Sequence, residues 1–144
     1  MLRFVHDICF YAPTLSYARY LSAKKDVYMY RFNELNPWEG EWKGESSHVL
    51  DIAFLFMNYN DYLEPGQKKQ AENFAEFFLR FVNGQAPWQQ WKEGQEVAMV
   101  MEGGKAELKK DVPSETGRRE EFIKLGKEVG FDKLLSVWGQ FASG

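Results

Sequence analysis

The sequence predicts an α/β fold in one domain, with two or three strands covered by about five helices. Residues 27–32 carry aromatic and β-branched side chains on both faces, which is typical of a strand inside a helix-covered parallel sheet. Residues 66–82 place apolar side chains at three- and four-residue steps, which predicts an amphipathic helix, and Gly84 suits its cap. The 144 residues, 44% hydrophobic and 27% charged, suffice for one core and exclude a mainly disordered chain.

Two helices are expected before the strand. Apolar residues recur at helical spacing in residues 2–11 and 13–21, and Pro13 suits the first turn of the second helix. After the strand, residues 33–47 contain Asn, Pro, Gly and Trp, which predict a long irregular loop. Loops of this length usually carry function.

The apolar run at residues 49–56 is ambiguous, because its periodicity does not separate a buried helix from a strand. We expect a short helix there, and the alternative is a strand at residues 52–56. A further strand is expected at residues 96–101, ended by Gly103 and Gly104.

Two helices are expected to close the chain. Ser114 begins a charged helix whose apolar positions include Phe122 and Val129, and a last helix covers residues 132–141.

The chain has too few expected strands to form a sheet in which residues 27–32 are an interior strand. A strand with both faces buried needs neighbouring strands. Residues 96–101 supply one neighbour, and residues 52–56 would supply a second if they formed a strand. A two-stranded sheet is marginal by itself. We therefore expect the chain to be a truncated part of a larger sheet protein, with its remaining strands upstream.

Several classes of function have no support in the composition. A net charge of -3 offers no general attraction for phosphates, so no nucleic-acid surface is expected. Cys9 is the one cysteine, and no Cys/His cluster has the spacing of a metal site, so neither a metal nor another cofactor is expected. No apolar run is long enough for a membrane span, and the first residues do not resemble a secretory signal.

Only two histidines could act as a general base. His6 lies in the first amphipathic helix and is interpreted as a boundary residue between core and water. His48 follows the long loop after the predicted interior strand. Open α/β sheets place their active sites at the carboxyl ends of strands. His48 is therefore the candidate catalytic residue.

The segment from Gly44 to His48 begins like the G-x-S-x-G nucleophile elbow, with Ser46 in the serine position. It lacks the second glycine, and no strand directly precedes it, so Ser46 is not expected to be a nucleophile. The loop carboxylates Glu39, Glu41 and Glu45 are expected to form a solvated edge. The loop tryptophans Trp38 and Trp42 are expected to anchor the loop to the core, and the alternative is that they line an ester pocket.

The order of these segments resembles a known family. Residues 27–32 (VYMYRF), 36–38 (NPW), 42–44 (WKG), His48 and 49–56 (VLDIAFLF) are similar to the C-terminal part of the type B carboxylesterases, the cholinesterase-like branch of the α/β-hydrolase fold, in the form found in many fungal members. Later segments agree with this resemblance (residues 74–78, 81–84, 87–88 and Trp91). It implies that residues 1–144 are the C-terminal portion of a carboxylesterase domain.

The resemblance also implies a role for His48. In that family the nucleophilic serine comes first in the chain, the acid second and the histidine last, so a C-terminal portion holds only the histidine of a Ser-His-Glu triad. The implied activity is hydrolysis of small-molecule carboxylic esters, with the chain inactive by itself. One departure is local, because residues 45–47 separate Gly44 from His48 where the family usually has two residues. Full-length relatives are often secreted.

An alternative function is a small non-catalytic binding or interaction module derived from the hydrolase fold. It would use an exposed sheet edge or the Trp-containing loop to hold a partner. Unpaired strand edges also predict self-association of the chain.

Overall fold

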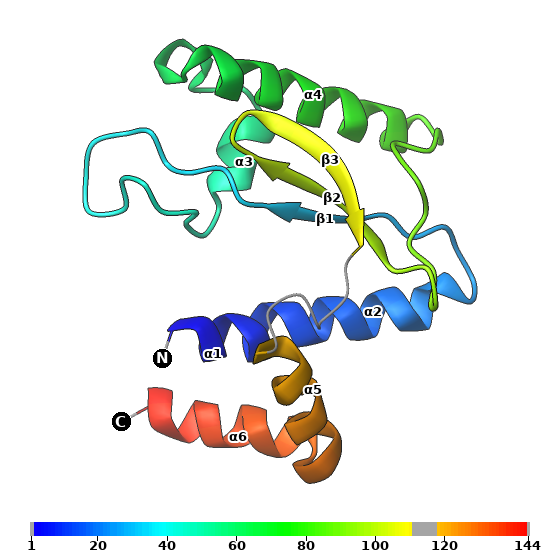
Figure 1. Ribbon diagram of the computed structural model, residues 1–144. Helices are drawn as coiled ribbons and strands as arrows, with labels where there is room; N and C mark the ends of the chain where they lie inside the picture. The colour runs from blue at the N-terminus through cyan, green and yellow to red at the C-terminus, as the bar shows by residue number, and fades with distance from the viewer. Residues whose placement is uncertain (1, 111–117, 144) are drawn as a thin grey trace. The chain divides into compact units, whose positions relative to one another are not determined.

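The computed structural model describes residues 2–110 and 118–143 and has a mixed α/β fold (Figure 1). It divides into two compact units. We call Asp26–Lys110, which contains the sheet, the sheet unit, and Met1–Lys25 together with Asp111–Gly144 the helical unit. The described residues form one three-stranded sheet and five continuous helical segments, which confirms the predicted fold class.

The strands are β1 (Met29–Phe32), β2 (Val97–Glu102) and β3 (Lys105–Lys110), in the order β1-β2-β3. β1 and β2 are parallel, as the side-chain pattern of residues 27–32 predicted, and β2 and β3 are antiparallel. Within the described residues β1 lies at an edge of the sheet and Tyr30 is 38% exposed, so the expectation of an interior strand with both faces buried is not met there. Gly103 and Gly104 both have positive φ (60° and 75°), the backbone that a two-residue hairpin turn requires.

Strand β3 was not predicted from the sequence. The glycine pair was expected to end a strand, whereas it reverses the chain into a further strand. The alternative strand at residues 52–56 is wrong, because this segment lies in helix α3 (Leu50–Leu55). Most of β3 is charged and exposed, so it lacks the apolar alternation by which a half-buried strand is recognised.

Helix α4 (Pro65–Val82) is the longest in the sheet unit and confirms the predicted helix. Pro65 lies in its first turn, where its missing N–H costs no hydrogen bond. Beyond Val82 the chain turns at Gly84, which has a φ of 72°. A short 3-10 turn, Asn60–Tyr62, lies between α3 and α4.

The core of the sheet unit lies between the sheet and the helices α3 and α4, which cover the same face (Figure 1). Phe54 and Phe74 are 0% and 1% exposed, and the ring of Phe32 lies 5.0 Å and 6.0 Å from theirs. Five further buried residues complete the cluster (Leu50, Leu63, Ala71, Met99 and Met101). This aromatic layer fixes β1 relative to both helices.

The helical unit begins with α1 (Leu2–His6), a π-helical turn (Asp7–Tyr11) and α2 (Ala12–Ser22), which continue as one helical segment. We expected two separate helices divided near Pro13. The π turn explains the continuity, since the N–H of Ala12 donates to the oxygen of Asp7 and the chain reaches the proline without a break.

The rest of the helical unit consists of α5 (Arg118–Val129) and α6 (Phe131–Ala142), separated by Gly130 with a φ of 89°. Ser114, the expected start of α5, lies outside the described residues. Apolar residues of α5, α6 and the N-terminal segment form the core of this unit (Ile8, Ala12, Phe122, Phe131, Leu134 and Trp138). No helix among the described residues is long and apolar enough to cross a membrane.

Replacement of Phe74 by alanine tests the aromatic layer. The Phe74→Ala variant is expected to lose about 3–5 kcal/mol of unfolding free energy, because it removes a ring that is 1% exposed and leaves a cavity. Leu79→Ala on the same helix is the matched control. Its side chain is 63% exposed, so its effect is expected to stay within about 0.5 kcal/mol. Urea denaturation measures both, and equal midpoints would contradict this assignment of the core.

Candidate functional site

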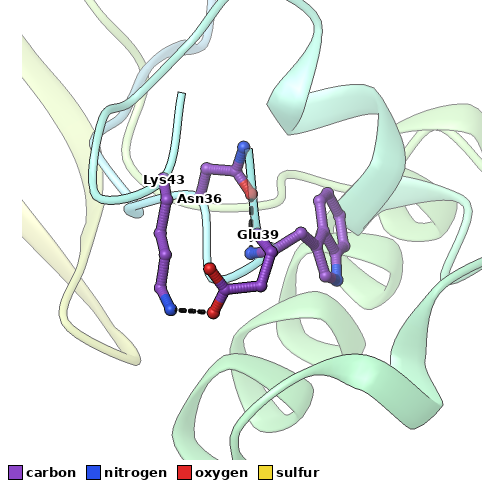
Figure 2. A network of polar contacts seen from close by, with 4 residues as sticks. Asn36, Glu39 and Lys43 are labelled. Atoms are coloured by element: carbon purple, nitrogen blue, oxygen red, sulfur yellow. Dashed lines mark hydrogen bonds and ion pairs between the residues drawn. The ribbon is translucent and has the colours of Figure 1, made fainter. Parts of the chain in front are cut away.

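The loop of residues 33–49 joins the carboxyl end of β1 to α3 and carries His48. Its backbone closes on itself, because Asn36 N–H donates to Glu45 O (3.1 Å) and Gly44 N–H donates to Asn36 O (2.8 Å). The side-chain oxygen of Asn36 also accepts the N–H of Trp38 at 2.9 Å (Figure 2). These bonds give the loop a defined conformation without regular secondary structure.

The tip of this loop faces water. Lys43 pairs with Glu39, whose side chain is 87% exposed (Figure 2). Glu41 and Glu45 are exposed as well, so the predicted solvated edge is confirmed. An ion pair at such exposure contributes at most about 1 kcal/mol to stability.

The two loop tryptophans differ. Trp38 is half-buried, packs against the core cluster and lies 5.3 Å from the ring of Tyr59, which confirms its expected anchoring role. Trp42 is 52% exposed, so the same expectation is wrong for Trp42. The difference arises because Trp38 follows the Asn36 turn toward the core, whereas Trp42 lies near the loop tip.

The first part of the loop is held by buried Glu34, which is 2% exposed and whose carboxylate accepts the N–H of Gly104 at 2.7 Å. Burial raises the pKa of Glu34, the bond from Gly104 opposes this shift, and the charge of Glu102 adds to it. A Cβ on Gly104 would come within 3.0 Å of the Gly66 backbone. The hairpin turn therefore packs closely on the start of α4 while it binds the loop.

A second bond holds the loop nearby. The side-chain amide of Gln67, in the first turns of α4, donates to Leu35 O at 2.9 Å. With Glu34, this bond fixes the loop where it leaves β1.

The end of the loop is held by Ser46, whose hydroxyl donates to Phe32 O at 3.0 Å. The bond returns the loop to the end of β1 two residues before His48. The segment contains no strand-to-helix elbow at Ser46, which lies in irregular backbone. This hydrogen bond therefore gives Ser46 a structural role in holding the loop.

His48 is exposed and lies directly before a sharp change of chain direction. Val49 has a φ of 64°, a left-handed conformation that is rare for a β-branched residue and costs about 1–2 kcal/mol. The next residue, Leu50, is 4% exposed and begins α3 in the core. Strained backbone of this kind concentrates at functional sites and persists where neighbouring packing demands it.

Asp51 connects the start of α3 to the sheet, and its role was not anticipated from the sequence. The hydroxyl of Tyr30 in β1 donates to Asp51 Oδ2 at 3.0 Å. Burial raises the pKa of Tyr30 to about 12, and the charge of Asp51 and this hydrogen bond add to the shift. Tyr30 is therefore a neutral hydrogen-bond donor at physiological pH.

An apolar cavity of about 90 Å³ lies beside β1 in the sheet unit. Its lining is aromatic apart from one proline (Tyr28, Tyr30, Phe74, Phe77, Phe78, Phe81, Pro87 and Trp88). His48 is not among these residues, so the structure does not bring the candidate base to this cavity. Within residues 2–110 and 118–143, no group of three or more His, Cys, Asp or Glu is placed to hold a metal ion.

Comparison with known proteins establishes the fold. No protein-family model and no curated protein matches this sequence. Among solved structures, PNB esterase is similar, with a TM-score of 0.69 and 20% sequence identity over 81% of this chain. The chain spans 26% of the PNB esterase chain. Its mixed α/β fold therefore matches part of an α/β-hydrolase esterase.

The Glu34→Gln variant tests the buried carboxylate. The pKa of folded Glu34 lies above its usual value of 4.5, so its contribution to stability is complete below that pH and is lost as pH rises through the raised value. Glutamine keeps an oxygen for Gly104 but has no charge to desolvate. We expect the Tm of the variant, relative to the native chain, to increase from acidic to neutral pH.

Thermal unfolding across this pH range measures the difference. Glu41→Gln, at an exposed loop position, is the control and is expected to show a constant offset. A pH-independent offset for Glu34→Gln would show that Glu34 has the same pKa in the folded and unfolded states.

Proposed function

We propose that this chain supplies the general base, His48, of a serine carboxylic ester hydrolase acting on small-molecule esters. One observation carries the proposal: an exposed imidazole lies on a fixed loop after the carboxyl end of a parallel strand, in a fold that matches part of an esterase. The nucleophilic serine, the orienting glutamate and the oxyanion-binding groups would come from outside these residues.

In this role the imidazole of His48 takes the proton from the serine hydroxyl as the oxygen attacks the ester carbonyl. It then returns that proton to the leaving alcohol. The glutamate holds the ring in the tautomer whose other nitrogen accepts the proton. Water then takes the place of the serine hydroxyl as the attacking group, with the same histidine as base.

The geometry of the loop supports a defined position for the ring. Residues 45–47 include one residue more than the related family usually has before its histidine, which would displace a loosely held imidazole. Glu45 is tied to Asn36 through its carbonyl oxygen and Ser46 is tied to Phe32, so two of the three residues are held. This matters because a displacement of about 1 Å at a reacting group can cost roughly a hundredfold in rate.

A second candidate function is a non-catalytic interaction module. It is favoured by one observation: β1 pairs only with β2 among the described strands, so its other edge has no strand partner in the described part of the chain.

The isolated chain is expected to hydrolyse no nitrophenyl ester above background, because a general base without a nucleophile and an oxyanion hole lacks the larger contributions to catalysis. The assay compares the native chain with His48→Ala. Turnover that disappears in the variant would show that a complete catalytic set is already present and would overturn the proposed division of the site.

A chimera tests His48 directly. The matching 26% of PNB esterase would be replaced by this chain and assayed on a nitrophenyl ester. We expect esterase activity that falls at least about a hundredfold in the His48→Ala version, as loss of a general base requires. His6→Ala, at the other histidine of the chain, is the matched control and is expected to retain activity. A folded chimera whose activity is equal with and without His48 would favour the interaction module.

A further inference from the structure

Two hydrogen bonds tie the segment around His48 to the same strand. The hydroxyl of Ser46, two residues before His48, donates to Phe32 O at 3.0 Å. Three residues after His48, Asp51 Oδ2 accepts the hydroxyl of Tyr30, also at 3.0 Å. Tyr30 and Phe32 are alternate residues of β1, so their side chains lie on the same face of the sheet. The segment is therefore held to β1 on both sides of the histidine.

Tyr30 is a fixed donor for the second of these bonds. Its backbone lies opposite Met99 of β2, and its ring lies 5.2 Å from that of Phe74 in α4. Because the pKa of Tyr30 is raised to about 12, the hydroxyl keeps its proton at physiological pH and donates it to the carboxylate. The sheet and the core thus hold the hydroxyl that Asp51 binds.

The carboxylate of Asp51 connects this hydroxyl to the strained turn beside His48. Its second oxygen, Oδ1, accepts the N–H of Ile52 at 3.0 Å. The same N–H donates to Val49 O at 3.2 Å. Val49 is the residue with the left-handed backbone, at a φ of 64°. The Asp51 carboxylate and the carbonyl of the strained residue therefore meet at one N–H group.

We propose that Tyr30 and Asp51 are positioning residues for His48, because their hydrogen bond holds the turn at Val49 and, through it, the imidazole. The inference rests on the proposed role of His48 as general base. Tyr30 and Asp51 act through the turn and not on the reacting atoms. Loss of their bond would let the turn relax toward an ordinary backbone and would move the ring away from its working position.

Two other roles for Asp51 make different predictions. A residue that only satisfies the first turn of α3 needs the N–H of Ile52, and removal of the Tyr30 hydroxyl would then leave catalysis unchanged. A residue that acts by its negative charge would lose its effect in Asp51→Asn, although asparagine keeps an oxygen that accepts the bond from Tyr30. A positioning role requires the hydroxyl and the oxygen but not the charge.

The PNB esterase chimera separates these roles through kcat and KM on a nitrophenyl ester. We expect Tyr30→Phe to lower kcat about tenfold and to leave KM within about twofold, because the substrate binds as before while the base is displaced. Asp51→Ala is expected to have the same effect, and the double variant no larger one, since all three lack the same bond. Asp51→Asn is expected to recover most of the lost rate.

Tyr28→Phe is the matched control for Tyr30→Phe. It removes a tyrosine hydroxyl two residues earlier in the same segment. The ring of Tyr28 packs on Phe81 of α4 and on Trp88, at 6.0 Å and 6.2 Å between ring centroids. The control is expected to leave kcat and KM unchanged.

A measurement on the chain itself requires no activity. A positive φ brings the amide hydrogen and Hα of a residue close together, so the intraresidue NOE between them is strong. We expect a strong NOE for Val49 in the native chain and in Tyr28→Phe, and a weaker one in Tyr30→Phe. This readout separates the inference from the proposed function, because it does not depend on His48 acting as a base.

Three results would overturn the inference. The first is a chimera that needs His48 but has the same kcat with and without the Tyr30 hydroxyl, in which case the proposed function stands by itself. The second is an Asp51→Asn variant as slow as Asp51→Ala, which would assign the effect to charge. The third is a Val49 NOE of equal strength in Tyr30→Phe and the native chain. A chimera that does not need His48 would instead overturn the proposed function, and with it the catalytic part of the inference.

Discussion

The packing of Phe32 between Phe54 and Phe74 is the constraint on which the sheet unit depends. Its ring contacts both helices, while its strand pairs with β2 through main-chain hydrogen bonds. Aromatic contacts of this kind add about 0.5–1.5 kcal/mol each to the free energy of area burial. Because the long loop begins directly after Phe32, its starting point is as well fixed as the core. The far end of the loop returns to the same point, because the hydroxyl of Ser46, two residues before His48, donates to Phe32 O.

The loop then holds its shape through hydrogen bonds that return to fixed elements. Glu34 and Leu35 bind the hairpin turn and α4, and Ser46 returns to the end of β1. Each such bond contributes about 0.5–1.5 kcal/mol. Together they are of the size needed to offset the left-handed backbone at Val49, about 1–2 kcal/mol. The strain beside His48 is thus sustained by the hydrogen bond of Ser46 before it and by the burial of Leu50 after it.

The same strand is central to both candidate functions. One end of β1 leads to the loop with the candidate base, and one edge of β1 presents unprotected backbone and aromatic side chains. A fold shared with part of an esterase accommodates either use, because function resides in particular side chains and not in the architecture.

The sequence alone predicted the elements with strong periodicity or composition: a strand within residues 27–32, which the structure has at Met29–Phe32, the helix at 66–82, which the structure begins at Pro65, and the parallel pairing. It also indicated His48 as the candidate base, which stays a proposal. These depend on local side-chain patterns that are visible in one chain. β3 was missed because its charged residues show no buried face, and Trp42 was misjudged because composition does not tell which tryptophan of a loop turns inward. Glu34 and Asp51 gained their roles only when distant segments came together, Glu34 beside Gly104 and Asp51 beside Tyr30. Tertiary structure decided them because a hydrogen bond between remote residues leaves no periodic trace in the sequence.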